Sequence, residues 1–353
     1  MNRLQAIRPF GQRIWLDNLS RELLASGELA RLLQEDGIAG VTSNPAIFHK
    51  AISTDPRYRD ELAQLKTNAA LSAEQRYETL VIADIQAACD LNLAQYRATG
   101  GDDGYVSLEV SPELSRDEAG TLAAARRLWA AIDRPNAMIK IPATAEGIAA
   151  FRQLTAEGVN VNITLLFSLR QVEAVWDAYI AGLAARHAAG LPLGHIKAVA
   201  SFFLSRVDSL LDEQLPAELQ GKVAVALSRV AYQRYLERFH GAEFAALKAA
   251  SARAQFLLWA STGTKNKAYS DVLYVESLIG EETVNTVPDA TLALFRDHGN
   301  AAATLGQDVA AARATLAAAQ AAGVDFDVVG EKLQQDGLVL FEKAFAELLK
   351  LTA

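Results

Sequence analysis

Cysteine is nearly absent from this chain: Cys89 is the only one in 353 residues. One cysteine cannot form an intrachain disulfide, and it cannot supply a thiolate cluster for a metal. The histidines lack the close spacing of zinc ligands; they are His49, His187, His195, His240 and His298. We therefore predict chemistry that needs no metal ion and no cofactor.

An excess of positive charge, long apolar runs and nucleotide-binding loops are missing as well. Acidic residues outnumber basic ones by 42 to 34, which gives a formal net charge of -8 and argues against nucleic acid or anionic membranes as partners. Met1 is followed by Arg- and Asp-bearing sequence and not by an apolar signal core, so we expect a cytoplasmic protein. The glycine-rich segment 100–104 lacks the lysine and spacing of a P-loop and reads as a turn.

Apolar side chains are abundant, at 51% of the sequence, and can fill a sizeable core. Short apolar runs of strand length alternate with longer helical patterns. The eight predicted strands cover residues 13–16, 40–43, 105–110, 137–141, 159–165, 197–203, 255–260 and 283–287. Eight alternating units without a dinucleotide fingerprint favour a closed (β/α)8 TIM barrel over an open doubly wound sheet.

Further helical patterns exceed the eightfold alternation. Additional helices are predicted at 55–66, 72–93, 222–252, 306–320 and 326–350, the last two separated by a break at Gly323. The Ala-rich piece 301–322 keeps helical propensity and reads as a surface or lid helix. Because no low-complexity linker divides the chain, we predict a single barrel domain over residues 1–353 with a C-terminal helical extension over about 301–353.

A lysine interrupts one of the apolar strands. In a strand over 137–141, Ile139 and Ile141 face one way and Lys140 faces the other. Branched aliphatic surroundings remove hydration from an ammonium group and favour the neutral, nucleophilic amine, which can attack a carbonyl. Taken alone, a lysine in a strand is more often a side chain that reaches solvent from a strand edge than a catalytic group.

Other polar side chains are predicted to meet Lys140 at one end of the barrel. Strand alternation puts Asn162 and Thr164 on one face, turns Glu109 inward from another strand, and places Asp17 just after the first strand. The carboxyl ends of parallel strands share one mouth, where barrel enzymes carry their chemistry. Glu109, through a water held by Thr164, suits the proton transfers of imine formation, and Asp17 suits deprotonation of a hydroxyl during carbon–carbon cleavage.

Amides and an anion-binding pair complete the predicted site. Asn44 and Asn162 can hold hydroxyl groups, while Ser201 and Arg206 can receive a phosphate. Each residue also has a structural interpretation. Asn44 before Pro45 suits a turn, and Arg206 suits a solvated helix face.

The other candidate site residues also have structural interpretations. Asp17 could cap a helix that starts near Ser20, and Glu109 could pair with a neighbouring cation. Ser201 and Phe203 could simply fill the barrel.

Five segments, taken together, resemble the transaldolases. They occur in the family's order and spacing, which makes their coincidence more specific than any one of them. The segments are 42–45 (TSNP), 106–110 (VSLEV), 139–144 (IKIPAT), 161–168 (VNITLLFS) and 200–206 (ASFFLSR).

The resemblance implies a metal-independent class I enzyme of the non-oxidative pentose phosphate pathway with a (β/α)8 fold. Such enzymes move a dihydroxyacetone unit from sedoheptulose 7-phosphate or fructose 6-phosphate to glyceraldehyde 3-phosphate or erythrose 4-phosphate. It implies that Lys140 forms the Schiff base, that Asp17 is the acid/base of the aldol step, and that Glu109 and Thr164 manage a catalytic water.

The resemblance also assigns the substrate contacts. It implies that Asn44 and Asn162 hold the dihydroxyacetone part and that Ser201 and Arg206 contact phosphate. Phe203 stands where the related fructose 6-phosphate aldolases tend to carry Tyr, which favours transfer over simple cleavage.

One segment departs from the family. Many transaldolases carry a second phosphate-binding arginine after strand seven, but no arginine occurs in residues 259–267 of this chain. We expect Lys265 to substitute, with Lys267 as the close rival. Sugar phosphates are the expected partners, and the chain is expected to be a monomer or a homodimer. An aldolase that releases free dihydroxyacetone, and a barrel that binds sugar phosphates without catalysis, remain the alternatives.

Overall fold

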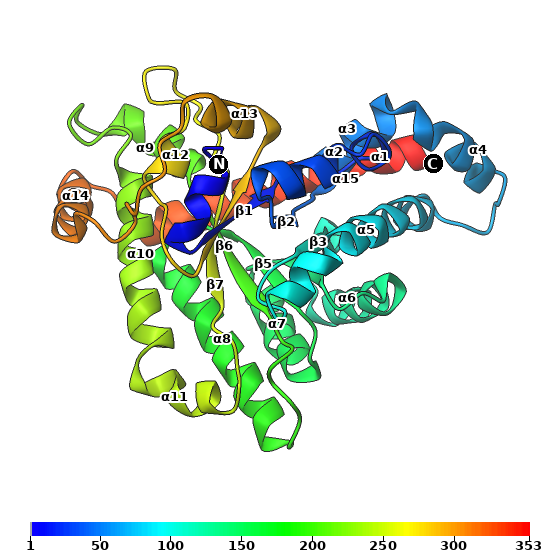
Figure 1. The fold of residues 1–353 in the computed structure, drawn as a ribbon, viewed down its shortest axis with the longest axis horizontal. Coiled ribbons are helices and arrows are strands. Elements are labelled where there is room, and N and C mark those ends of the chain that lie inside the picture. Colours follow the sequence, from blue (N-terminus) through cyan, green and yellow to red (C-terminus); the bar gives the residue numbers. More distant parts are fainter. Residues whose placement is uncertain (1) are drawn as a thin grey trace.

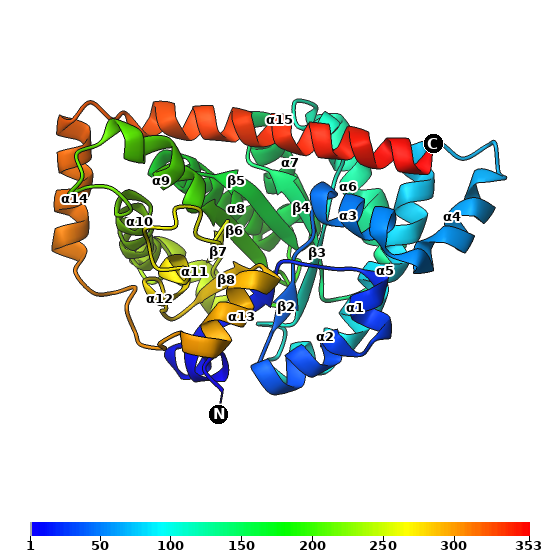
Figure 2. The ribbon, with the colours of Figure 1, turned by 90° about the horizontal axis from the view of Figure 1, so that it is seen from above.

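Eight parallel strands form a closed barrel in the computed structural model, which describes residues 2–353 (Figures 1 and 2). The strands are β1 Gln12–Leu16, β2 Gly40–Val41, β3 Tyr105–Glu109, β4 Ala137–Pro142, β5 Val161–Leu166, β6 Ala198–Phe203, β7 Phe256–Ala260 and β8 Thr283–Val287. Each strand pairs with its sequence neighbour, and β1 closes the barrel by pairing with β8 along its whole length. The predicted (β/α)8 barrel is confirmed.

Helices surround the barrel and extend beyond it. They are α1 Arg21–Ala25, α2 Glu28–Arg31, α3 Pro45–Thr54, α4 Arg59–Lys66, α5 Ala73–Ala98, α6 Glu118–Ile132, α7 Ala145–Glu157, α8 Leu169–Ala188, α9 Ser205–Leu211, α10 Val223–Phe239, α11 Ala242–Ala249, α12 Leu273–Glu276, α13 Asp289–His298, α14 Val309–Ala321 and α15 Phe326–Thr352. Within residues 2–353, no helix combines the length and the apolar character needed to cross a membrane.

All eight predicted strands are present, but several predicted boundaries were wrong, including the ends of β2 and α5 and the extent of the helix predicted over 222–252. Strand β2 stops at Val41, since the chain turns there toward α3, whose N-cap is Asn44. The predicted helix 222–252 is two helices, α10 and α11, separated at Gly241. A Cβ atom on Gly241 would lie 2.2 Å from the carbonyl oxygen of Glu237, so the tight junction needs glycine.

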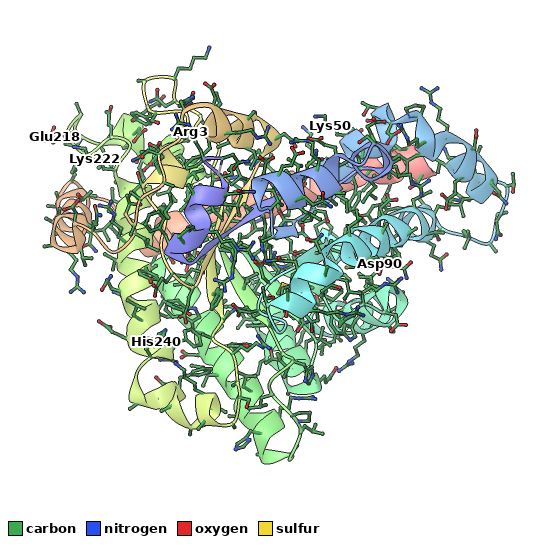
Figure 3. All side chains as sticks on the ribbon, in the orientation of Figure 1. Arg3, Lys50, Asp90, Glu218, Lys222 and His240 are labelled. Carbon is green, nitrogen blue, oxygen red and sulfur yellow. The ribbon has the colours of Figure 1, made fainter. Side chains whose placement is uncertain are left out.

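The strands are buried on both faces. Strands β3 to β8 consist entirely of buried residues, because side chains fill the barrel on one side and helices cover the other. Charged side chains on the outer helices reach solvent, as the exposed residues Lys50, Asp90 and Lys222 illustrate (Figure 3). The polar residues inside the barrel are therefore surrounded by an apolar core.

Helix α15 runs across the carboxyl-terminal mouth of the barrel, while α14 packs beside α10 (Figure 2). The side-chain amide of Gln334 donates to the carbonyl oxygens of Ala143 at 2.8 Å and Leu165 at 3.1 Å, which ties α15 to the ends of β4 and β5. At the end of the helix, Thr352 Oγ1 donates to the carbonyl oxygen of Ala73 at 2.8 Å. The final helix thus covers part of the mouth, whereas the Ala-rich α14 lies on the side.

Candidate active site

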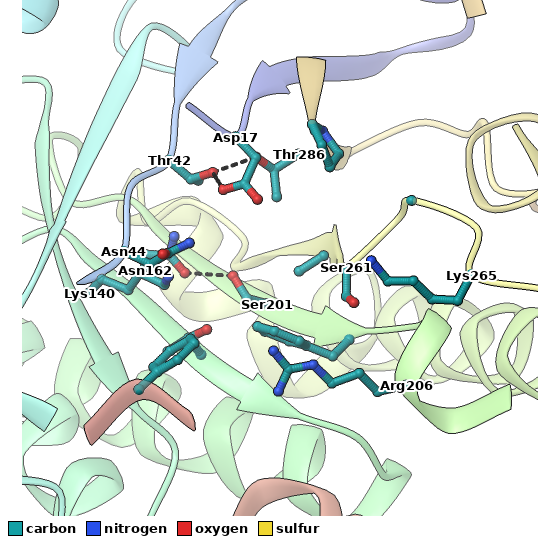
Figure 4. A pocket seen from close by; sticks show the side chains of 16 residues that line it. Asp17, Thr42, Asn44, Lys140, Asn162, Ser201, Arg206, Ser261, Lys265 and Thr286 are labelled. Carbon is teal, nitrogen blue, oxygen red and sulfur yellow. Dashed lines mark hydrogen bonds between the residues drawn. The ribbon is translucent and has the colours of Figure 1, made fainter. Parts of the chain in front are cut away.

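A cavity of about 170 Å³ opens at the carboxyl ends of the strands (Figure 4). Of the site residues predicted from sequence, all but Glu109 line it; they are Asp17, Asn44, Lys140, Asn162, Thr164, Ser201, Phe203, Arg206 and Lys265. They come from separate strands and loops, so barrel closure brings together residues far apart in the sequence. Glu109 lies behind the lining, in contact with Lys140.

The strand register explains why Lys140 has these neighbours. Lys140 on β4 is the Cα partner of Glu109 on β3 and of Asn162 on β5. Side chains at matched positions of adjacent parallel strands point to the same side of the sheet. One polar row therefore crosses three strands inside the barrel.

Lys140 and Glu109 form a buried ion pair. Lys140 is 6% exposed, and its Nζ lies 3.2 Å from Glu109 Oε2 and donates to the carbonyl oxygen of Ser43 at 3.2 Å. Burial raises the pKa of Glu109, and the charge of Lys140 opposes that rise. A carboxylate with a raised pKa is a better proton acceptor, so Glu109 can take a proton from the ammonium group and leave a nucleophilic amine.

Thr164 contributes a hydroxyl to the cavity lining from β5, two residues beyond Asn162. Thr164 Oγ1 and Glu109 Oε1 are buried and have no hydrogen-bond partner within residues 2–353. Buried polar atoms are nearly always satisfied, so these two suit a water molecule or a substrate hydroxyl. Strand β5 is irregular here: its register shifts between Ile163 and Leu166, and Leu165 has a φ of 64°.

Asp17 is held by Thr42, which in turn contacts Thr286. Thr42 Oγ1 donates to Asp17 Oδ1 at 2.8 Å and lies 2.5 Å from Thr286 Oγ1 (Figure 4). Burial raises the pKa of Asp17, while the charge of Lys140 and the Thr42 hydroxyl lower it. Asp17 does not cap α1, because Ser20 does so by accepting a hydrogen bond from the backbone N–H of Leu23.

The interior amide Asn162 is fixed on both sides. Ser201 Oγ donates to Asn162 Oδ1 at 2.6 Å, and Asn162 Nδ2 donates to Ser107 Oγ at 3.1 Å. Ser201 thus lies beside Asn162. Asn44 caps α3 by accepting from the backbone N–H of Ile47 at 3.0 Å. The cap uses the side-chain oxygen of Asn44, so its amide NH₂ is the group that can donate to a substrate hydroxyl.

Arg206, Ser261 and Lys265 lie on the side of the cavity away from Lys140 (Figure 4). Burial lowers the pKa of Arg206, and its Nη1 has no hydrogen-bond partner in the described part of the chain. Lys265 lines the cavity, whereas Lys267 is not among the lining residues. Arg206 and Lys265 are two cationic side chains at the same end of the cavity, which favours binding of an anionic group there.

Phe203 is buried and lies beside Arg206 in the cavity lining. Its ring centroid lies 5.3 Å from that of Phe167, and the guanidinium carbon of Arg206 lies 5.4 Å from the Phe203 centroid. The position therefore presents an apolar face without a hydroxyl. Across residues 2–353, no group of three or more His, Cys, Asp or Glu side chains is arranged to hold a metal ion.

Comparison with known proteins identifies the family. The family model described as transaldolase/fructose-6-phosphate aldolase matches residues 14–352. The chain belongs to this family.

Relatives named transaldolase cover nearly the whole chain. The protein from Neisseria gonorrhoeae is 56% identical over 349 residues, and the one from Thiobacillus denitrificans is 53% identical over 356 residues, each covering 99% of both chains. Transaldolase 1 of Streptomyces coelicolor is 46% identical over 354 residues, or 98% of this chain and 93% of its own length. The resemblance seen in the five sequence segments is confirmed.

Among the lining residues that were not predicted as site residues, three carry a hydroxyl and one carries an aromatic ring: Thr42, Ser261, Thr286 and Phe341. Thr42 lies in the segment 42–45 (TSNP), but its contact with Asp17 joins the ends of two strands, β1 and β2. Thr286 and Ser261 lie at the ends of β8 and β7, and a polar residue at a strand end was the available signal. Ser261 has a φ of 55°, an uncommon conformation for a side chain larger than glycine. Phe341 comes from α15, and no local pattern indicated it.

Proposed function

We propose that this protein is a transaldolase that forms a Schiff base on Lys140. It moves a dihydroxyacetone unit from sedoheptulose 7-phosphate or fructose 6-phosphate to glyceraldehyde 3-phosphate or erythrose 4-phosphate. The observation that carries the proposal is the 3.2 Å pairing of Lys140 with Glu109, in contact with a cavity that holds a second carboxylate, Asp17. Relatives named transaldolase, at up to 56% identity, support the reaction class.

Imine formation uses the first carboxylate. Glu109 accepts a proton from Lys140, and the amine attacks the ketose carbonyl carbon to give a carbinolamine. Glu109 then returns a proton to the departing hydroxyl, through a water at Thr164, and the C–O bond breaks to leave an iminium. The raised pKa of Glu109 suits both directions of this transfer.

Carbon–carbon cleavage uses the second carboxylate. Asp17 takes the proton of the C4 hydroxyl, the C3–C4 bond breaks, and its electrons move into the iminium on Lys140. The aldose leaves, and a three-carbon enamine stays attached to the enzyme. An acceptor aldose then reverses these steps, with Asp17 returning the proton to the new hydroxyl.

The remaining residues are proposed to bind substrate. Asn44 and Asn162 hold hydroxyls of the three-carbon unit, while Arg206, with Ser201 and Lys265, binds the phosphate end. Phe203 leaves no hydroxyl where a proton donor would favour release of free dihydroxyacetone. We further propose that the enzyme acts in the non-oxidative pentose phosphate pathway of the cytoplasm, as a monomer or homodimer.

Borohydride reduction with fructose 6-phosphate, followed by peptide mass spectrometry, tests the proposal. The Lys140 peptide should gain the mass of a reduced adduct, and Lys140→Ala should abolish the gain. Lys197 is an internal control, because it is also buried but lies at the start of β6, at the opposite end of the barrel.

The alternatives give different results. An adduct that turns over without an acceptor aldose would indicate an aldolase. Binding of sugar phosphate without any adduct would indicate a non-catalytic barrel. Full activity of Lys140→Ala would refute the Schiff-base assignment.

A further inference from the structure

An aromatic ring from the final helix covers the Lys140 amine. The Phe341 ring centroid lies 5.4 Å from Lys140 Nζ, and Phe341 is 7% exposed. Among the described residues that line the cavity, Phe341 alone comes from α15. Helix α15 crosses the mouth of the barrel (Figure 2), so Phe341 approaches the amine from the side of the mouth.

The position of Phe341 is fixed by contacts on both sides of it along α15. One turn before it, Gly337 packs so closely that an added Cβ would lie 2.9 Å from Leu165 Cδ2 and 3.3 Å from Arg206 Nη1. One turn after it, the ring of Phe345 meets that of Tyr77 edge to face at a centroid distance of 5.8 Å. With the Gln334 hydrogen bonds to the barrel, these contacts hold the ring over the pocket.

The two aromatic residues that line the cavity lie at different ends of it. Phe203 lies beside Arg206, at the end proposed for phosphate, whereas Phe341 lies beside Lys140, where the covalent intermediate forms. An aromatic face attracts a nearby cation and excludes water from the space that it fills. Phe341 therefore contacts the nitrogen that becomes an iminium.

We propose that Phe341 is a specificity-determining residue that shields the enamine carbon on Lys140 from protonation by outside water, so that the three-carbon unit leaves to an acceptor aldose. The inference rests on the proposed transaldolase function. In the competing reaction, the enamine carbon takes a proton, water adds to C2, and the C2–N bond breaks. One water is consumed, and the products are free dihydroxyacetone and the Lys140 amine.

The test compares Phe341→Ala with Leu340→Ala. Leu340 is the adjacent residue, is 53% exposed and points away from the cavity, so it controls for changes to α15 itself. The measurement is the ratio of free dihydroxyacetone to transferred product, with fructose 6-phosphate as donor and erythrose 4-phosphate as acceptor. Phe341→Ala should raise this ratio about tenfold or more because the ring no longer excludes water, and Leu340→Ala should leave it unchanged.

A second variant keeps the proposal testable if Phe341→Ala does not fold. Phe341→Leu keeps apolar bulk but loses the ring, and it should raise the ratio by a smaller factor. A fall in turnover with an unchanged ratio in the folded variants would overturn the proposal, because Phe341 would then act only in packing. Failure of the unmodified protein to form a borohydride adduct at Lys140 would instead overturn the proposed function.

Discussion

The buried pair of Lys140 and Glu109 yields the sharpest prediction. Glu109→Gln preserves the shape of the side chain and removes its charge. At a separation of 3.2 Å, and with an effective dielectric constant of about 20, the lost attraction is about 5 kcal/mol. Loss of one partner of a buried pair typically costs about 3–5 kcal/mol, so the free energy of unfolding should fall by that order.

The same substitution should slow imine formation. Without the Glu109 carboxylate, no adjacent base takes the ammonium proton and no acid protonates the departing hydroxyl. The loss of one general acid–base group usually costs about 10²–10⁴-fold in rate. Single-turnover borohydride trapping with fructose 6-phosphate measures this step directly, and Asp17→Asn, which should still trap, is the matched comparison.

Two outcomes would refute this reasoning. Trapping at the rate of the unmodified protein would show that Glu109 does not carry the proton. For stability, the double variant Glu109→Gln with Lys140→Met should recover most of the loss, because it leaves no unpaired charge in the barrel. If the double variant unfolds as easily as Glu109→Gln alone, the stability loss does not come from the orphaned ammonium.

Two further predictions concern Asp17 and the phosphate end. Thr42→Val removes a hydrogen bond that lowers the pKa of Asp17, so the pKa should rise further. Since cleavage needs the ionised carboxylate, the acidic limb of the kcat/KM profile should move to higher pH; a limb that stays in place or moves to lower pH would contradict the assignment. Lys265→Ala should raise the KM for fructose 6-phosphate about tenfold, or about 1.4 kcal/mol, whereas Lys267→Ala, outside the cavity lining, should not. Equal effects of the two variants would remove the special role of Lys265.

Most of the fold could be predicted from sequence because strand alternation is a local property. Ile139 and Ile141 flank Lys140 in a strand whatever the rest of the chain does, and parallel strands bring their carboxyl ends to one mouth. The same alternation predicts that the side chains of Glu109 and Asn162 point into the barrel. The break at Gly241 was missed because helical propensity on both sides of it is high, and only the close approach of a carbonyl requires glycine there.

The sequence by itself determined the barrel, the inward lysine and the polar residues at the ends of its strands, since each depends on the period of a short segment. Tertiary structure alone decided which residues touch. The 3.2 Å contact of Lys140 with Glu109 follows from the register of two strands, and the support of Asp17 by Thr42 follows from barrel closure. Phe341 reaches Lys140 only because α15 packs across the mouth, and that packing depends on contacts between segments nearly two hundred residues apart, such as Gln334 and Ala143.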